Sequence, residues 1–310
     1  MSSVTATVVA RRRGRSLLWR EKVDGFVMIA PWLIGFVVLT VGPMLVSAGL
    51  AFTNYDILTP PKFTGTANLE RLFADDLFYK SLRNTAIYTF LGVPLHVSVA
   101  LLAAMLLNTK VAGQAFYRTA FYMPSMTPPV ANALVWLWIY NPDFGLANIV
   151  LNAAHLPAQK WLWDKDMAIP SLILMSLWAL GSQMITFLAG LQNVPPQLHE
   201  AAAIDGATAL QRFRHITLPM LSPIILFNLI VALIGSFQVF TTAYIATNGG
   251  PENATLFFVL YLYRNGFEFF KMGYASALAW VLFLIVLVFT LIQFRLSKRW
   301  VYYEGDLKKG

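Results

Sequence analysis

The residue types that carry most enzyme chemistry are scarce in this sequence, and their spacing matches no catalytic or metal site. His199 and Glu200 begin the zinc-binding pattern H-E-x-x-H, but Ala203 stands where the second histidine is needed. His155, His199 and His215 lack the spacing of metal ligands. The chain has no cysteine, and no glycine is followed by lysine, which excludes thiolate sites and a Walker A loop. We therefore expect a protein that is not an enzyme and that binds no metal or cofactor itself.

The elements that would have to position any functional residue are apolar stretches long enough to cross a membrane. The chain has 310 residues, of which 57% are hydrophobic and 12% charged, and its mean hydropathy is +0.60. A bilayer core takes up roughly 20 apolar residues per helical crossing. Six stretches lack Asp, Glu, Lys and Arg altogether: 25–52, 84–108, 119–140, 168–192, 220–247 and 272–294. We predict an all-α integral membrane protein with six transmembrane helices.

The third stretch, 119–140, is the least regular, because Pro124, Pro128 and Pro129 interrupt helical hydrogen bonding. Charge counting supports it as a crossing, since Lys and Arg concentrate on the cytoplasmic side. With six crossings and the N-terminus inside, the cytoplasmic pieces hold 15 Lys and Arg and the external pieces hold 8. Without this crossing the split is 12 against 11, which removes the bias. Both termini are therefore predicted to be cytoplasmic.

The chain divides into a basic N-terminal segment 1–24, a six-helix transmembrane domain 25–294 and a cytoplasmic tail 295–310. The basic cluster between Arg11 and Lys22 could bind nucleic acid or anionic lipid. Directly before an apolar span, its simpler role is to anchor the N-terminus inside, so we expect no nucleic-acid partner.

No Asp, Glu, Lys or Arg lies inside the six stretches, which argues against proton relays within the chain. His96 is the only histidine there, and we interpret it as a hydrogen-bonding residue in helix packing rather than as a relay. A sodium-coupled carrier built on backbone carbonyls and broken helices remains possible.

The longest cytoplasmic loop between spans, 193–219, has the local signals of a helix-turn-helix. Pro195 and Pro196 suit a first helical turn, and Gly206 is a natural stop because a residue past a helix end often needs positive φ. Thr208 and Gln211 have capping-box spacing for a second helix. Such a stiff projection could receive a push from a neighbouring subunit, or it could simply fold back on the bilayer.

The same loop resembles, position for position, the EAA-x3-G-x9-I-x-LP motif in the membrane subunits of binding-protein-dependent ABC importers. The resemblance implies that the loop is a coupling helix that docks into an ATPase subunit. The residues that match the motif or extend the likeness are Glu200, Ala201, Ala202, Asp205, Gly206, Phe213, Ile216, Leu218 and Pro219.

Further stretches are similar to permeases of the carbohydrate-uptake branch, which includes the maltose and glycerol-3-phosphate importers. They are the pair Asn84-Thr85, the run 121–148 and TNGGPENAT at 247–255. The C-terminal sequence looks like the maltose-permease-F-like partner of the usual heterodimer. The resemblance implies a bacterial inner-membrane permease that pairs with a second permease, an ATPase dimer that holds ATP and Mg2+, and an extracytoplasmic sugar-binding protein.

If the solute is a sugar, its path needs uncharged hydrogen-bond formers beside aromatic rings. The spacing of 178 and 182, and of 237, 241 and 244, predicts one helix face in each of two spans. The same side chains could instead form hydrogen bonds between helices. Asn132 and Asn228 are weaker candidates for the solute path. The candidate path residues are Trp178, Ser182, Gln183, Ser236, Phe237, Gln238, Thr241 and Tyr244.

The function implied is alternating-access import of a sugar, driven by ATP hydrolysis in the partner. The alternative is a self-sufficient secondary carrier or channel, which would work without an ATPase.

Overall fold

Helices form most of the chain in the computed structural model, which describes residues 14–109 and 112–302. Arg11 to Arg13 and the tail from 303 lie outside the described residues. The α-helices and strands are α1 (Gly14–Phe36), α2 (Gly42–Leu50), β1 (Thr53–Asn54), β2 (Lys62–Phe63), α3 (Ala67–Phe73), α4 (Asp76–Leu107), α5 (Gln114–Tyr122), α6 (Pro129–Ile139), α7 (Leu146–Ala153), α8 (Ala168–Leu177), α9 (Gly181–Gln192), α10 (Pro196–Ile204), α11 (Ala209–Arg212), α12 (Leu218–Phe237), α13 (Thr241–Ala246), α14 (Phe258–Tyr263) and α15 (Met272–Ser297). Short π-helical turns cover Val37–Val41, Phe213–Thr217 and Arg264–Glu268, and 3-10 turns cover Met123–Met126 and Trp161–Trp163.

Four continuous helical runs are long and apolar enough to cross a membrane: Trp19–Leu50, Asp76–Leu107, Ala209–Phe237 and Met272–Ser297. They contain most of the predicted first, second, fifth and sixth stretches. The bent pair of α8 and α9 makes a fifth candidate when it is counted as one span. The described part of the chain therefore has four or five candidate spans.

The third predicted stretch is broken, as its prolines require. α5 ends at Tyr122, a 3-10 turn follows, and α6 is an apolar helix of only 11 residues. Pro128 lies just before α6 and Pro129 opens it, where a missing backbone N–H costs nothing. A helix of this length does not cross a bilayer by itself, so the six-helix count is not confirmed.

The fourth stretch breaks where one helix face was predicted. α8 ends before Trp178, α9 begins at Gly181, and the two helices meet at 48°. The prediction that Trp178 and Ser182 share a helix face is therefore wrong. Sharp kinks are common at Gly/Ser pairs, and Gly181-Ser182 is such a pair.

The fifth stretch shows the same effect at its C-terminal end. α12 ends at Phe237, and a new short helix, α13, begins at Thr241. The prediction that Phe237, Thr241 and Tyr244 share one helix face is therefore wrong. The pair Gly235-Ser236 precedes the break, and such pairs are common at sharp kinks.

α4 is the central helix of the bundle and packs against α8, α9, α12 and α14. Small residues such as Ala100 and Ala104, which are fully buried, let these helices approach closely. At the start of α9, a Cβ on Gly181 would lie 2.7 Å from both the backbone oxygen of Phe121 and the Cα of Tyr122. The α5–α9 contact therefore depends on the absence of a side chain at 181.

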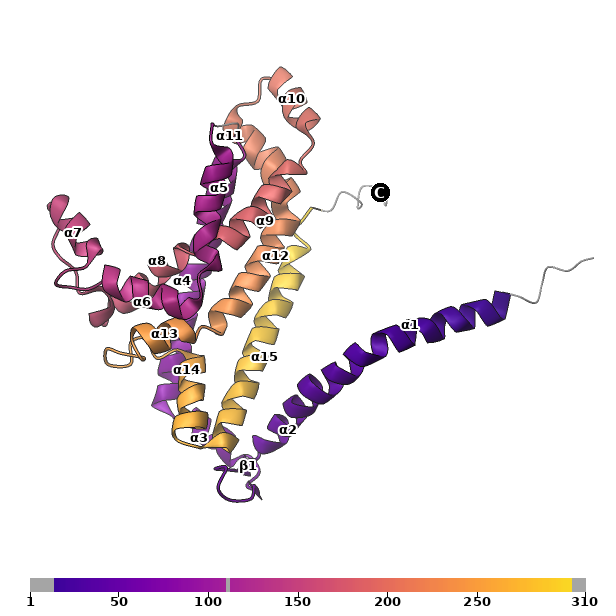
Figure 1. Ribbon diagram of the computed structural model, residues 1–310, viewed down its shortest axis with the longest axis vertical. Coiled ribbons are helices and arrows are strands. Elements are labelled where there is room, and N and C mark those ends of the chain that lie inside the picture. The colour runs from indigo at the N-terminus through magenta and orange to yellow at the C-terminus, as the bar shows by residue number, and fades with distance from the viewer. Residues whose placement is uncertain (1–13, 110–111, 303–310) are drawn as a thin grey trace, which may run out of the picture.

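The first helical run extends away from the rest of the molecule (Figure 1). None of the most apolar window of Trp19–Leu50 is buried in the isolated chain. Large apolar side chains are exposed along it, including Phe26 at 72% and Met28 at 82%. Such a surface is stable in lipid or against another membrane helix, and not in water.

Candidate functional site

The loop 193–219 forms two helices joined by a tight turn, as its sequence signals indicate. α10 starts at Pro196 and ends at Ile204, and Gly206 has φ +77°. The N–H of Gly206 donates to the carbonyl of Ala203 at 3.1 Å, and the N–H of Ala207 donates to that of Ala202 at 2.9 Å. This pair of bonds is the Schellman motif, which satisfies the last carbonyls of a helix and needs a left-handed residue.

The second helix opens with the predicted capping box. The N–H of Gln211 donates to Oγ1 of Thr208 at 3.3 Å, and the N–H of Thr208 donates to Oε1 of Gln211 at 2.7 Å. Both bonds satisfy backbone groups that a helix N-terminus otherwise leaves open. The turn between the two helices is thus fixed from both sides.

The second helix does not stop before the membrane but continues into α12, so that one run extends from Ala209 to Phe237. Pro219 lies near its middle, after a π-helical turn at Phe213–Thr217. The wider turn accommodates proline, which has no N–H and whose ring crowds the carbonyl four residues before it.

The tip of this helix-turn-helix carries exposed apolar side chains. Ile204 is 87% exposed and Leu210 is 74% exposed. Neither residue was singled out from the sequence, although a large apolar residue in a polar loop is a signal that could have found it. Figure 1 shows α10 at one end of the molecule, with α11 beside the end of α5.

The predicted coupling residues lie on both helices of the loop and on the start of α12. A recess of about 430 Å³ between the helices is lined by Ala202, Asp205, Gly206 and Ile216, among others. Exposed members of the predicted set are Glu200, Ala201, Asp205, Gly206 and Leu218, and half-buried members are Ala202, Phe213, Ile216 and Pro219.

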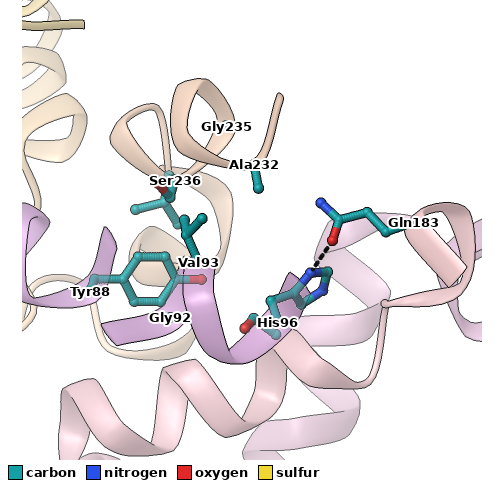
Figure 2. Close-up of a pocket in the computed structure, with 10 residues that line it drawn as sticks. Tyr88, Gly92, Val93, His96, Gln183, Ala232, Gly235 and Ser236 are labelled. Carbon is teal, nitrogen blue, oxygen red and sulfur yellow. Dashed lines mark hydrogen bonds between the residues drawn. The ribbon is translucent and has the colours of Figure 1, made fainter. Parts of the chain in front are cut away.

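A second feature is a cavity of about 180 Å³ between α4, α8, α9 and α12. Figure 2 shows Tyr88 and His96 on α4, Gln183 across from them on α9, and Ala232, Gly235 and Ser236 on α12. Nδ1 of His96 and Oε1 of Gln183 form an interhelical hydrogen bond of 2.8 Å. The predicted packing role of His96 is confirmed by this bond.

The structure brings two of the predicted path residues, Gln183 and Ser236, to this cavity. Trp178 lies at the break between α8 and α9, is 52% exposed and contacts Trp136 edge-on at 6.1 Å. Phe237 is 1% exposed and stacks on Phe289 in the core.

The other predicted path residues are separate from this cavity. Ser182 and Gln238 are exposed, whereas Thr241 and Tyr244 lie half-buried on α13. Asn228 is buried and donates to the carbonyl of Ile224 in its own helix at 3.0 Å.

Several cavity residues were not predicted. Tyr88, Gly92 and His96 line it together with Ser176. The first three are spaced by four residues and share a face of α4, a signal that was present in the sequence. Only the fold could show that Ser176 and Gln183 face them.

At the opposite end of the molecule, Asp75 links three segments. Its carboxylate accepts hydrogen bonds from the hydroxyls of Tyr261 and Tyr274 and from the N–H of Leu77. Partial burial raises the pKa of Asp75, but these hydrogen bonds outweigh burial and hold the pKa below its usual value. The guanidinium of Arg71 lies 4.6 Å from the centre of the Tyr274 ring.

Within residues 14–109 and 112–302, no group of three or more His, Cys, Asp or Glu side chains is placed to hold a metal ion. The two features offer exposed apolar side chains on the loop and hydrogen-bonding groups in the cavity.

Comparison with known protein families gives one match over most of the chain. A family described as "Binding-protein-dependent transport system inner membrane component" matches residues 86–302. A probable ABC transporter permease, YesP of Bacillus subtilis (strain 168), is 44% identical over 302 residues, covering 96% of this chain and 97% of that protein. The lactose transport system permease LacF of Rhizobium radiobacter is 36% identical and covers 88% of this chain and 93% of its own length.

Solved structures with a similar fold also belong to ABC transporters. A chain of a bacterial ABC transporter involved in the import of the acidic polysaccharide alginate has a TM-score of 0.79 at 25% identity, with 91% of this chain and 98% of that chain covered. The alginate transporter in complex with an alginate pentasaccharide-bound periplasmic protein shares the fold, with a TM-score of 0.79 at 24% identity, covering 93% of this chain and 98% of that chain.

Proposed function

Since this chain belongs to the family of inner membrane components of binding-protein-dependent transport systems, we infer that it is a permease subunit of an ABC importer for sugars or oligosaccharides. It is a multi-pass protein of the cytoplasmic (inner) membrane. The observation that carries the mechanism is the helix-turn-helix at 196–212, whose exposed Ile204 and Leu210 offer apolar contacts to a partner.

We propose that this partner is an ATPase dimer, which binds ATP and Mg2+. Ile204 and Leu210 would enter a cleft in the ATPase, while Glu200 and Asp205 offer charged contacts at its rim. Burial of two such side chains contributes about 1.5 to 3 kcal/mol each at most. A second, homologous permease and an extracytoplasmic sugar-binding protein complete the assembly.

The proposed topology has six crossings and cytoplasmic termini. α5, the 3-10 turn and α6 together would make the third crossing, with the irregular backbone shielded by protein. Non-helical backbone at membrane depth is tolerated only in such places. The excess of Lys and Arg in the cytoplasmic pieces supports this arrangement.

The proposed solute path includes the cavity between α4, α9 and α12. Gln183 and Ser236 would bond sugar hydroxyls, while Tyr88 would contact the apolar ring face. Trp178 would contribute outside the cavity, at the break between α8 and α9. Closure of the ATPase dimer would move the loop and expose the cavity outward. The contributions of Ser182, Phe237, Gln238, Thr241 and Tyr244 would lie outside the cavity itself.

The test is a pull-down from mild detergent with this chain as bait. Gly206→Pro should lose a co-purifying ATPase, because proline cannot adopt φ +77°. Gly206→Asn should retain it, because asparagine tolerates the left-handed region. Equal retention by both variants, each folded by gel filtration, would overturn the assignment of the loop.

A second pair of variants separates docking from folding. Ile204→Ser and Leu210→Ser should weaken ATPase binding about tenfold or more, while stability changes by less than about 0.5 kcal/mol because both residues are exposed. Leu58→Ser is the matched control, since Leu58 is 88% exposed in the proposed external region. Solute passage in liposomes by a homo-oligomer without an ATPase would instead establish the secondary carrier or channel.

A further inference from the structure

The cavity between α4, α8, α9 and α12 is polar but uncharged. No Asp, Glu, Lys or Arg is among the described residues that line it. The polar side chains on its walls are Tyr88, His96, Ser176, Gln183 and Ser236. A carboxylate placed there would meet no Lys or Arg of this chain, and an unpaired charge among apolar groups is costly. The fold is shared with an importer of an acidic polysaccharide, so the fold alone does not set the charge of the solute.

The two serine hydroxyls of the cavity have already committed their protons. The hydroxyl of Ser176 donates to the carbonyl oxygen of Ile173 at 2.6 Å, and that of Ser236 donates to the carbonyl oxygen of Leu233 at 2.8 Å. A hydroxyl has one proton and two lone pairs. Toward a solute, both serine oxygens therefore act as acceptors.

His96 fixes the direction of the Gln183 amide. The hydrogen bond of 2.8 Å joins Nδ1 of His96 to Oε1 of Gln183. Because an amide oxygen only accepts, Nδ1 carries the proton, and Nε2 of the neutral ring is then an acceptor. Figure 2 shows the amide nitrogen of Gln183 on the side away from the imidazole, toward Ala232. The amide thus presents its NH2 group, with two donors, to the cavity.

The resulting set of donors and acceptors fits a hydroxyl-rich solute. Three groups accept, namely the hydroxyls of Ser176 and Ser236 and Nε2 of His96, whereas the Gln183 amide donates. A sugar hydroxyl both donates and accepts, so it can bond with either kind of group. An ionised carboxylate only accepts, so it would be repelled by three of these four groups.

We propose that this cavity selects a neutral, hydroxyl-rich sugar over an acidic one, and that His96 is a positioning residue that holds the Gln183 amide for it. The proposal rests on the function inferred above and names the class of sugar that the cavity takes. Without the Nδ1 donor, the amide is free to turn its oxygen toward the solute. Such a turn replaces the two donors of the cavity with another acceptor.

The experiment measures the unfolding midpoint of the detergent-solubilised complex of permeases and ATPase at neutral pH, without the sugar-binding protein. A ligand that binds only the folded state raises this midpoint. The probes are lactose and maltotriose, each compared with the same sugar oxidised to a carboxylate at its terminal primary alcohol. The neutral sugars should raise the midpoint, and the oxidised sugars should need about tenfold higher concentrations or more, which corresponds to about 1.4 kcal/mol.

Variants of His96 separate positioning from stability. His96→Leu should lose the shift caused by sugar, whereas His96→Asn should keep most of it, because the asparagine amide can donate in place of Nδ1. Ser47→Ala is the matched control, since it removes another hydrogen bond between helices, from Nε1 of Trp280 to Oγ of Ser47 at 3.2 Å. Ser47 does not line the cavity, so this variant should have a lower midpoint without sugar but an unchanged shift with it.

The outcomes distinguish this proposal from the function on which it rests. An oxidised sugar that acts as well as its neutral parent, no shift with either neutral sugar, or a full shift in His96→Leu would overturn the proposal. Uptake of sugar into liposomes by the wild-type importer with its binding protein would leave the importer function standing in each of these cases. Failure of the wild type to take up any sugar would overturn both.

Discussion

The side-chain amide of Asn84 donates a hydrogen bond of 2.9 Å to the carbonyl oxygen of Asn253, 169 residues further along the chain. The same amide reaches the carbonyl of Leu256 at 3.2 Å, and Thr85 accepts a bond from the N–H of Phe258 at 2.9 Å. Two separate sequence motifs, Asn84-Thr85 and 247–255, are thus one structural unit. The loop before α14 is held on α4 by side chains of the first motif.

Replacing Asn84 with leucine should loosen this unit. The change leaves two loop carbonyls without their donor, at a cost of about 1 to 3 kcal/mol. We expect a lower unfolding midpoint in detergent and faster hydrogen exchange at 253–258. Asn54→Leu, at an exposed position of the β-hairpin, is the control. Unchanged exchange in Asn84→Leu would contradict the role given to this amide.

A side chain at Gly181 should push α9 away from α5. The new Cβ of Gly181→Ala would lie 2.7 Å from backbone atoms that cannot rotate away. Overpacking of this kind costs about 1 to 3 kcal/mol. The control is Gly35→Ala, where no atom lies within 4 Å and where alanine should stabilise the helix by up to about 1 kcal/mol. The midpoint of thermal unfolding should fall in Gly181→Ala and rise in Gly35→Ala.

The bonds to Asp75 make part of the stability depend on pH. Its pKa in the folded protein is below the ordinary 3.8, so the ionised form is favoured by folding. This contribution is complete above pH 3.8 and is lost as the pH falls through the lower, folded value. Asp75→Asn should therefore lower the melting temperature near pH 6, and the gap from the wild type should narrow below pH 3.8. A gap that stays constant down to acid pH would show that the charge of Asp75 is not involved.

The hydrogen bond between His96 and Gln183 should appear as a coupling energy. In a double-mutant cycle with His96→Leu and Gln183→Leu, we expect a coupling of about 0.5 to 1.5 kcal/mol in detergent-solubilised protein. Strict additivity would mean that the bond does not contribute to stability. Uptake measured on the same variants would show whether the pair also matters for the solute.

The parts that could be predicted from the sequence are governed by local rules. Pro196, Gly206 and the Thr208–Gln211 pair act within one turn of chain, and the structure has the helix start, the stop and the cap where these residues stand. The four long helical runs could also be predicted from the sequence, because the length of an apolar stretch is enough to identify a candidate membrane span.

The parts that could not be predicted depend on breaks and on distant partners. Helix periodicity placed Trp178 with Ser182 on one face, but the Gly181-Ser182 kink separates them. The contact of His96 with Gln183 joins residues that no spacing rule connects. Phe237 was a reasonable path candidate by residue type, yet only the packed structure shows its ring against Phe289.

The continuous helical run from Ala209 to Phe237 is about 44 Å long, at 1.5 Å per residue. Leu210 lies near the N-terminal end of the run, and Ala232, Gly235 and Ser236 line the cavity near its C-terminal end. A tilt of about five degrees about the middle of a straight helix of this length shifts each end by about 2 Å. In the proposed assembly, a solute and an ATPase that each prefer one tilt would change the affinity for one another by the same factor, by thermodynamic reciprocity. In that assembly, occupancy of the cavity would change the affinity of the loop for the ATPase through a single helix.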